Sequence, residues 1–371
     1  MSKDLHDVTD FEALMAAARR CCQNVRWKAS VQMFEVDSLR WFARLQKEME
    51  SGTYKSKGFK KFDIMERGKV RHIQSVHISE RVAQKSLCDN AIRPEVYPRL
   101  IYDNSASQKN KGTEFALKRL REHLRWHYAR FGTQGGILLV DNHDYFSSIR
   151  HDIAIDEINR HFEDEGLKHY VAYFINAFDG DTGLGLGSEI SQISAIYYLN
   201  DIDKAIKEKF GIHGYARYMD DSYVISDSIE TLEEIRNFIA EKSKAYGIEL
   251  NTKKTTIVQF KGHSFEYLKK SVKLTESGKI VMNILPENIR KERARIRFQR
   301  AEYDAGRMPV SSIWGSYQSW RGYAKKYNNY KAIGEMDAYF NKIMKGVDFS
   351  DYRRTKRSNG KEPETRSGAT E

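Results

Sequence analysis

Apolar residues at helical spacing mark several segments of the chain. From residue 36 to residue 49 they recur every three or four positions, at Val36, Leu39, Phe42, Leu45 and Met49, which predicts a helix over 37–51. This spacing predicts a helix that turns one apolar stripe toward a core. Asp37 and Ser38 are expected to cap its start. The same reasoning predicts helices over 9–23, 78–98, 114–130, 150–177, 188–209, 229–246 and 286–345.

Other segments show the shorter repeat of strands. Apolar and basic residues alternate from 52 to 75 around Glu66–Lys69, which predicts a basic β-hairpin. The apolar run Ile137–Val140 predicts a buried strand that ends at Asp141. Further strands are expected over Tyr215–Ile225, Thr255–Phe260 and Ser264–Leu268, a polar loop over 103–113, and a disordered tail from Arg353 to Glu371.

Composition narrows the class of partner. The chain has 62 Lys and Arg against 51 Asp and Glu, a formal charge of +11, with 18 Phe and 21 Tyr. Cations and aromatic rings together fit a nucleic acid, although a basic soluble surface would give the same balance. Three cysteines without a Cys-x-x-Cys pattern argue against a disulfide framework or a zinc site and indicate a cytoplasmic protein. No apolar stretch reaches the roughly 18–20 residues of a membrane span.

The candidate chemistry lies where acids interrupt apolar strands. Asp220 and Asp221 follow Tyr218 and Met219, whereas hairpin turns usually carry Gly. Carboxylates beside large apolar side chains are costly unless a cation offsets their charge. With Asp141 as the third acid, the set predicts two bound Mg²⁺ ions, or Mn²⁺, that promote nucleotidyl transfer. For the Asp-Asp pair alone, a simple acidic turn remains the alternative.

Five motifs in order within residues 60–285 resemble the reverse transcriptase family. They are Leu139–Ile149, Gly183–Gln192 leading into Ala195–Asn200, Arg217–Asp221, Gly247–Thr255 and Phe265–Leu268. Upstream, three segments resemble the fingers of bacterial reverse transcriptases from the branch of group II introns, retrons and diversity-generating retroelements. These segments are Lys69–Ile73, Glu80–Gln84 and Ser105–Gly112.

The resemblance implies an α+β fold shaped as a right-hand polymerase with fingers, an antiparallel palm sheet and a small helical thumb. The expected domains are an N-terminal helical extension at 1–55, fingers at 56–135, a palm at 136–285 with fingers helices inserted at 150–180, a helical thumb at 286–348 and a disordered tail at 349–371.

The resemblance also assigns roles to residues. Asp141, Asp220 and Asp221 are expected to be catalytic and to bind the metal ions. The incoming dNTP is expected to contact Lys69, Arg71, Arg81, Asn142, His143, Tyr145 as a steric gate, Leu186, Gly187, Gln192 and Lys254. Nucleic-acid contacts are expected from Lys109, Lys111, Tyr218, Met219, Phe265, Tyr267, Arg293, Arg297 and Trp320.

Two residues point to the subtype. Many family members have Gln at the position of Leu186 and Ser-Pro at Ser191-Gln192, and the pattern here resembles diversity-generating retroelement enzymes. Leu cannot donate the hydrogen bond of a Gln, so low fidelity is expected. The expected partners are a structured template RNA, the cDNA or primer and dNTPs, with a small accessory protein as a further candidate. A retron-like or defence-associated enzyme that makes antiviral cDNA, and an RNA-binding scaffold with a palm fold, remain alternatives.

Overall fold

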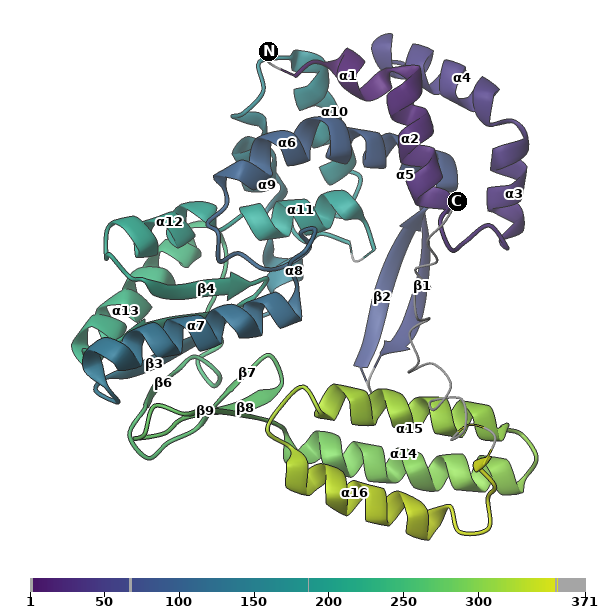
Figure 1. Cartoon of the computed structure of the whole chain (residues 1–371). Coiled ribbons are helices and arrows are strands. Elements are labelled where there is room, and N and C mark those ends of the chain that lie inside the picture. The colour runs from purple at the N-terminus through teal and green to yellow at the C-terminus, as the bar shows by residue number, and fades with distance from the viewer. Residues whose placement is uncertain (1–2, 67–68, 186, 351, 353–371) are drawn as a thin grey trace, which may run out of the picture. The chain divides into compact units, whose positions relative to one another are not determined.

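The computed structural model describes residues 3–66, 69–185, 187–350 and 352. The chain forms two compact units, Met1–Lys261 and a second that begins at Gly262. Each contains helices and antiparallel strands (Figure 1), so the predicted α+β class is confirmed. No helix in the described part of the chain is long and apolar enough to cross a membrane.

The first unit begins with helices α1 (Leu5–Thr9), α2 (Phe11–Cys22), α3 (Ala29–Val36) and α4 (Ser38–Glu50). Asp10 caps α2 because its carboxylate accepts hydrogen bonds from the next helical N–H groups. The predicted stripe on α4 is only partly correct. Phe42, Leu45 and Met49 are buried, but Val36 and Leu39 are 89% and 63% exposed. Val36 is the last residue of α3, and Leu39 lies in the first turn of α4. Asp37 is the N-cap residue, yet its side chain makes no capping bond.

A two-stranded hairpin follows, formed by β1 (Phe59–Glu66) and β2 (Lys69–Val76). The next predicted helix, 78–98, is helical throughout but not uniform. Helix α5 (Ile78–Leu87) widens into a π turn (Cys88–Ile92), then continues as α6 (Arg93–Val96) and a short 3₁₀ turn (Tyr97–Arg99). Pro94 has no N–H to donate, and the wider turn before it accommodates that loss.

The central sheet of the first unit has the strand order β4-β5-β3-β6, with every pair antiparallel. Helices α7 and α13 pack on it (Figure 1). The strands are β3 (Gly136–Asp141), β4 (Gly214–Tyr218), β5 (Asp221–Ser226) and β6 (Thr256–Gln259), and the two helices are α7 (Thr113–Phe131) and α13 (Ile229–Ala245). The apolar run of β3 is therefore the centre of the sheet, with a neighbour on either side.

Two glycines allow these neighbours to approach β3 closely. A Cβ on Gly135 would lie 2.1 Å from the carbonyl oxygen of Ser226, and one on Gly136 would lie 2.5 Å from that of Val258. Gly135 also has a φ of +75°, which side chains disfavour. Both positions therefore require glycine for the sheet to assemble.

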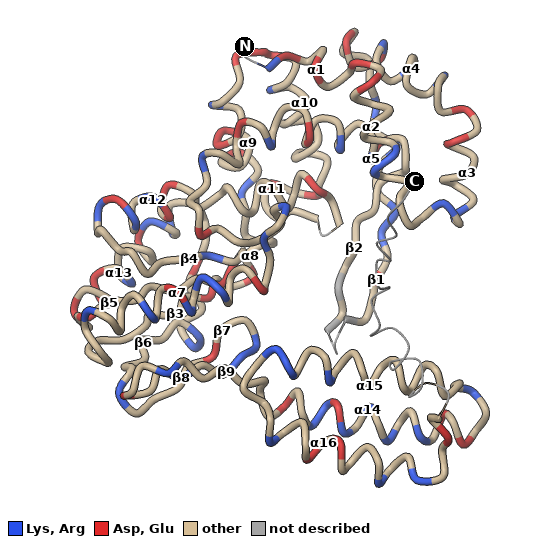
Figure 2. The backbone as a smooth tube through the Cα atoms, in the orientation of Figure 1, with Lys and Arg blue, Asp and Glu red and all other residues tan. Residues whose placement is uncertain are grey.

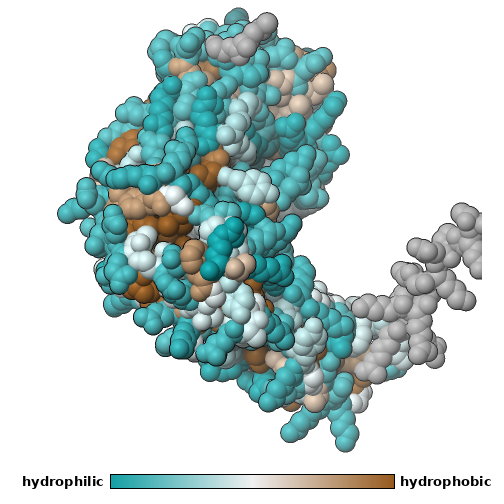
Figure 3. All heavy atoms as spheres, turned by 60° about the vertical axis from the view of Figure 1, so that its left-hand side comes forward, coloured by the Kyte–Doolittle hydropathy of each residue, from teal (hydrophilic) through white to brown (hydrophobic). Residues whose placement is uncertain are grey.

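Helices α8 (Tyr145–Ser148), α9 (His151–Asn159), α10 (Glu165–Ile175), α11 (Glu189–Tyr197) and α12 (Asn200–Glu208) complete the first unit. Helix α11 is almost entirely buried, and the core extends from it to the N-terminal helices. The face drawn in Figure 3 is largely hydrophilic, with apolar side chains in separate patches.

The second unit joins a three-stranded antiparallel sheet to three helices. The strands are β7 (Phe265–Tyr267), β8 (Lys270–Leu274) and β9 (Ile280–Ile284), and the helices are α14 (Pro286–Asp304), α15 (Val310–Ala324) and α16 (Tyr330–Ile343). Stacked rings of Tyr317 and Phe340, with centroids 3.9 Å apart, join α15 to α16. The predicted domain boundaries stay predictions, and the predicted disordered segment Arg353–Glu371 lies outside the described residues.

Candidate active site

A cleft of about 850 Å³ opens in the first unit beside the end of β3. Its lining brings together Asp141, Asn142, Tyr145, Asp220 and Lys254, all of which were expected at the site. His143, also expected at the site, lines the cleft as well, and the other lining residues are Val70, His72, Gln74, Asp144, Phe146, Ser147, Phe178, Asp179, Thr182, Gly183, Leu184, Gly185 and Asn251.

The sheet register places the acids. Asp141, the last residue of β3, lies directly opposite Asp221, the first residue of β5. Residues directly opposite in an antiparallel pair have Cβ atoms about 4.5–5.5 Å apart, so two like charges face one another. Asp220 occupies the turn just before β5 and lines the same cleft. All three carboxylates are only partly exposed, which makes a nearby positive charge favourable.

Lys254 supplies one such charge. Its Nζ lies 3.1 and 2.9 Å from the two carboxylate oxygens of Asp141. This hydrogen bond raises the pKa of Lys254 above its usual value. The loop that carries Lys254 is fixed to the strand, because the Asn251 N–H donates to the Asp141 carbonyl at 2.8 Å. The ammonium group is therefore held beside an acid of the site.

The donor groups of the cleft suit a hard cation such as Mg²⁺. Carboxylate and carbonyl oxygens are its preferred protein ligands. The side-chain oxygen of Asn142 is buried and has no hydrogen-bond partner within the described residues, which leaves a further oxygen available. Among the residues that the structure describes, however, no three His, Cys, Asp or Glu side chains are grouped closely enough to hold a metal ion. The expected two-ion site therefore stays a prediction.

The turn between β4 and β5 has a strained backbone, which a buried arginine stabilises. Met219 has a φ of +56°, an uncommon conformation for a residue with a side chain. Arg217 donates from Nη1 to the Met219 carbonyl at 3.2 Å and pairs with Asp203 of α12 through Nη2 at 2.7 Å. Tyr215 also donates to Asp203, at 2.5 Å. Burial alone would lower the pKa of Arg217, but the Asp203 carboxylate raises it above the usual value.

A second buried polar cluster supports the same strands. His123 of α7 contacts the Tyr223 hydroxyl of β5 at 2.9 Å and lies 3.5 Å from the carboxylate of Asp103. Burial would raise the pKa of Asp103, but hydrogen bonds from His123 and Arg119 and the charge of Lys207 lower it below its usual range. The Asp103 carbonyl in turn accepts from the Arg217 N–H at 3.2 Å. The polar loop of 103–113 is thus tied to the acid-bearing hairpin.

The residues that follow Asp141 also line the cleft, and each has its own contacts. The Tyr145 ring is buried, and its hydroxyl donates to the Ala195 carbonyl at 2.6 Å. Asn142 donates to the Asp220 carbonyl at 3.3 Å. The His143 N–H donates to the Glu249 carbonyl, while its exposed ring lies 3.4 Å from Asp144. Asp144 is the N-cap residue of α8, but its side chain makes no capping bond.

Strand β2 contributes to the cleft through Val70, His72 and Gln74. The expected triphosphate contacts Lys69 and Arg71 alternate with these residues along the strand, opposite Glu66 and Ile64 of β1. His72 is paired with Asp63 at 2.7 Å. His72, whose role the sequence analysis did not predict, is thus a basic residue of this strand that lines the cleft.

Three other expected dNTP contacts lie elsewhere. Arg81, Gly187 and Gln192 line a separate pocket of about 370 Å³, which shares Gln74 with the cleft. The Arg81 guanidinium donates to the Ser75 hydroxyl, and Gln192 accepts from Ser107 at 3.2 Å. Leu186 lies outside the described residues.

The expected nucleic-acid contacts of the first unit differ in exposure. Lys109 is exposed. Lys111 is instead partly buried and donates to the carbonyls of Tyr102 and Asn104, so its ammonium group stabilises the loop. Tyr218 and Met219 are partly buried, and the Thr113 hydroxyl donates to that of Tyr218 at 3.4 Å.

In the second unit three of the expected aromatic contacts are buried. Phe265, Tyr267 and Trp320 are 4%, 4% and 9% exposed, so their rings belong to the core of this unit, and their contact with nucleic acid stays a prediction. Arg297 is exposed and donates to the Tyr339 hydroxyl, and the partly buried Arg293 lies over the Tyr339 ring.

Sequence reasoning missed the residues that support the site. Arg217 was noted only as the start of a motif, and Asp203 was not considered. One signal was available: a charged residue within the apolar strand Tyr215–Tyr218 requires a buried partner. The partner itself could not be identified, because several acids of residues 200–210 are equally placed in the sequence.

Comparisons with known proteins now bear on the site. Residues 57–272 match the family described as reverse transcriptase (RNA-dependent DNA polymerase). No curated protein matches the chain. Among solved structures, a Candida albicans telomerase in complex with a fragment of telomeric RNA is 12% identical, with 83% of this chain and 59% of that chain covered and a TM-score of 0.47. For an apo telomerase from Candida tropicalis these values are 12%, 67%, 52% and 0.47.

The chain spans little more than half the length of these telomerases, and likenesses of this size carry no argument about function. The family match is different, because it covers more than half of the chain and includes β3, the β4–β5 turn and Lys254. An RNA template and deoxynucleotides are the substrates that such a family implies. The chain belongs to the reverse transcriptase (RNA-dependent DNA polymerase) family.

Proposed function

We propose that the cleft beside β3 is the polymerase site of an enzyme that copies a dedicated structured RNA into cDNA. The observation that carries this proposal is the register of β3 and β5. It sets Asp141 opposite Asp221, while Asp220 lines the same cleft from the adjoining turn. Three acids at one sheet edge, under an open cleft, are suited to bind a nucleotide and a primer end together.

Asp141, Asp220 and Asp221 would hold two Mg²⁺ ions, whose chemistry is to activate the primer 3′-hydroxyl and stabilise the departing pyrophosphate. Lys254, held at Asp141, would donate a proton or a hydrogen bond to that leaving group. The Tyr145 ring, fixed by its bond to Ala195, would form a wall against the sugar of the incoming nucleotide.

Primer extension tests the assignment. An annealed DNA primer on an RNA template, with dNTPs and Mg²⁺, should be extended by the parent and not by Asp220→Ala/Asp221→Ala. Asp227→Ala, an acid beyond the end of β5, is the matched control and should extend normally. Equal incorporation by the parent and the double variant would refute the site.

We further propose that synthesis has low fidelity. Leu186 lies in sequence between Gly185, which lines the cleft, and Gly187, which lines the neighbouring pocket. An apolar side chain there cannot donate a hydrogen bond to the nucleotide, so discrimination that depends on this bond is lost. This supports a role like that of diversity-generating retroelement enzymes.

A fidelity measurement tests this second proposal. Sequencing of cDNA made on a defined RNA should show fewer substitutions for Leu186→Gln than for the parent. Leu186→Met, which restores no donor, is the control and should keep the parental error rate. An unchanged error rate in Leu186→Gln would sink the idea.

A dedicated template can be identified directly. Nucleic acid that copurifies with the protein should contain one predominant structured RNA and DNA complementary to it. Sequencing both would give the template, the primer and the product. A random mixture of cellular RNA would contradict a dedicated template.

A further inference from the structure

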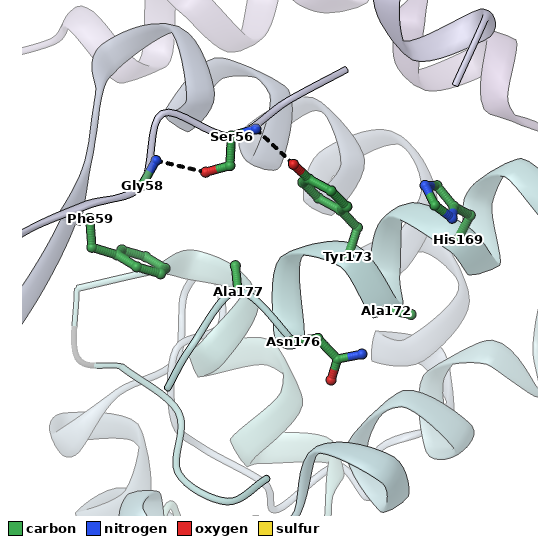
Figure 4. Close-up of a pocket in the computed structure, with 8 residues that line it drawn as sticks. All are labelled: Ser56, Gly58, Phe59, His169, Ala172, Tyr173, Asn176 and Ala177. Atoms are coloured by element: carbon green, nitrogen blue, oxygen red, sulfur yellow. Dashed lines mark hydrogen bonds between the residues drawn. The ribbon is translucent and has the colours of Figure 1, made fainter. Parts of the chain in front are cut away.

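A second pocket in the first unit lies between the segment that precedes β1 and helix α10 (Figure 4). It has a volume of about 560 Å³, within the range of small-ligand sites. Its lining residues are Ser56, Gly58, Phe59, His169, Ala172, Tyr173, Asn176 and Ala177. None of them lines the cleft that holds the acids, so its ligand is not the incoming nucleotide.

A buried carboxylate fixes the segment that forms one wall of this pocket. Glu80 is 1% exposed, and its two oxygens accept from the Ser56 hydroxyl at 2.7 Å and the Lys57 N–H at 3.0 Å. The Ser56 N–H donates to the Tyr173 hydroxyl at 2.7 Å, as Figure 4 shows. A buried acid that fixes a loop in this way preorganises the pocket and lowers the cost of binding.

The side chains around the pocket match a nucleobase. Phe59 lines the pocket and stacks on Phe178, which lines the acid-bearing cleft instead, with centroids 5.0 Å apart and planes at 18°. This stacking fixes an aromatic ring at the wall of the pocket, where a planar base can pack. Ala172 and Ala177 leave room beside the rings, and Asn176 presents an amide at the exposed end of α10. Aromatic faces hold unpaired bases, and an amide that both donates and accepts matches the edge of adenine.

The charge of the same segment fits the phosphates of an RNA strand. Lys55 and Lys60 flank, in the sequence, the residues that line the pocket, and Lys and Arg are blue along this stretch in Figure 2. The two other lysines of the stretch are engaged elsewhere, because Lys57 lies over the Trp41 ring and Lys61 pairs with Asp179. Lys55 and Lys60 are exposed. Lysines on either side of a base pocket neutralise the backbone of a continuing strand, which a free base or a protein segment does not offer.

We infer that this pocket binds one unpaired adenine of the RNA that the enzyme recognises, with Lys55 and Lys60 at the flanking phosphates. The inference rests on the proposed function, because it assigns the pocket to recognition of the structured RNA. It places that recognition outside the cleft, so the enzyme can hold its RNA while the copied region moves through the polymerase site.

Binding of two RNA hairpins tests the inference. They are fluorescein-labelled and identical except that one carries a single bulged adenine. The parent should bind the bulged hairpin more tightly. Asn176→Asp should lower the affinity for the bulged hairpin about tenfold and leave the affinity for the fully paired hairpin almost unchanged. Asn237→Asp makes the same change on exposed α13 and should behave as the parent.

Equal affinity of the parent for the two hairpins would overturn the inference. Equal losses in Asn176→Asp and Asn237→Asp would also overturn it, since a general charge effect would then explain the change. His169→Ala gives an independent variant of the same wall. Primer extension by the parent distinguishes failure of this inference from failure of the proposed function. If the parent does not extend the primer, the proposed function is refuted. If it extends the primer but does not prefer the bulged hairpin, only the base pocket is refuted.

Discussion

The guanidinium group of Arg217 and the carboxylate of Asp203 form a buried ion pair, with Nη2 and Oδ2 2.7 Å apart and side-chain exposures of 2% and 0%. Arg217 reaches from this pair to the Met219 carbonyl, next to Asp220. The buried Arg217 side chain therefore stabilises the strained turn that carries Asp220. This makes Arg217 a positioning residue for the acids.

Replacing Arg217 with Lys should impair the site more than the fold. The charge near Asp203 is kept, but the hydrogen bond to Met219 is lost, so Asp220 is less well fixed. We expect a lower kcat in primer extension and a higher Mg²⁺ concentration for half-maximal rate. Arg217→Met, which leaves Asp203 buried without its partner, should lose about 3–5 kcal/mol of stability. An unchanged Mg²⁺ requirement in Arg217→Lys would show that the pair serves stability alone.

Removing the Lys254 ammonium group should slow DNA synthesis without unfolding the protein. The side chain is 65% exposed, so its ion pair with Asp141 adds little stability. If Lys254 assists the leaving group, Lys254→Ala should reduce kcat by about a hundredfold. Lys253→Ala changes the adjacent exposed lysine and is the control. If Lys254→Ala keeps the parental kcat, the lysine does not assist the leaving group and only balances the charge of Asp141.

The main elements followed from the sequence because their patterns are local. The apolar run of β3 and the strand-turn-strand around Asp220 needed only short-range periodicity and were confirmed. Contacts between residues far apart in the sequence could not be predicted in this way. Nothing in the neighbourhood of Arg217 identified Asp203 as its partner, and no local pattern separated Arg81 and Gln192 from the cleft.

Burial of aromatic residues was also beyond the sequence. Phe265, Tyr267 and Trp320 occupy motifs that suggest nucleic-acid contact, but rings can equally fill a core. The structure buries all three rings. The same sequence letters therefore supported two interpretations that only packing could separate.

Shortening the side chain of Tyr145 should admit ribonucleotides. If its ring forms the wall against the sugar, Tyr145→Ala removes the clash with a 2′-hydroxyl and raises the incorporation of rNTPs relative to dNTPs. Tyr145→Phe keeps the ring and loses only the hydrogen bond to Ala195, so it should keep discrimination and lose about 1 kcal/mol of stability. Competition assays with paired rNTP and dNTP measure the ratio. Equal discrimination in the Ala variant and the parent would exclude a gate.

The stability of the first unit should fall between pH 6.5 and pH 4 through His161. Burial, with Arg99 and Arg160 nearby, lowers the pKa of His161 from 6.5 to about 4, and its Nε2 lies 2.6 Å from the Tyr197 hydroxyl. In this pH range the unfolded chain takes up a proton that the folded protein does not. Stability is therefore lost as the pH falls, and the contribution is fully present above pH 6.5.

His161→Gln removes this titration but keeps a hydrogen-bonding group for Tyr197. Thermal unfolding midpoints measured from pH 7 to about 4 should therefore decline less steeply in the variant than in the parent. His6→Gln, which replaces an imidazole that is 69% exposed, controls for the loss of a histidine and should follow the parental curve. Parallel curves for the parent and His161→Gln would mean that His161 takes up its proton equally in the folded and unfolded protein.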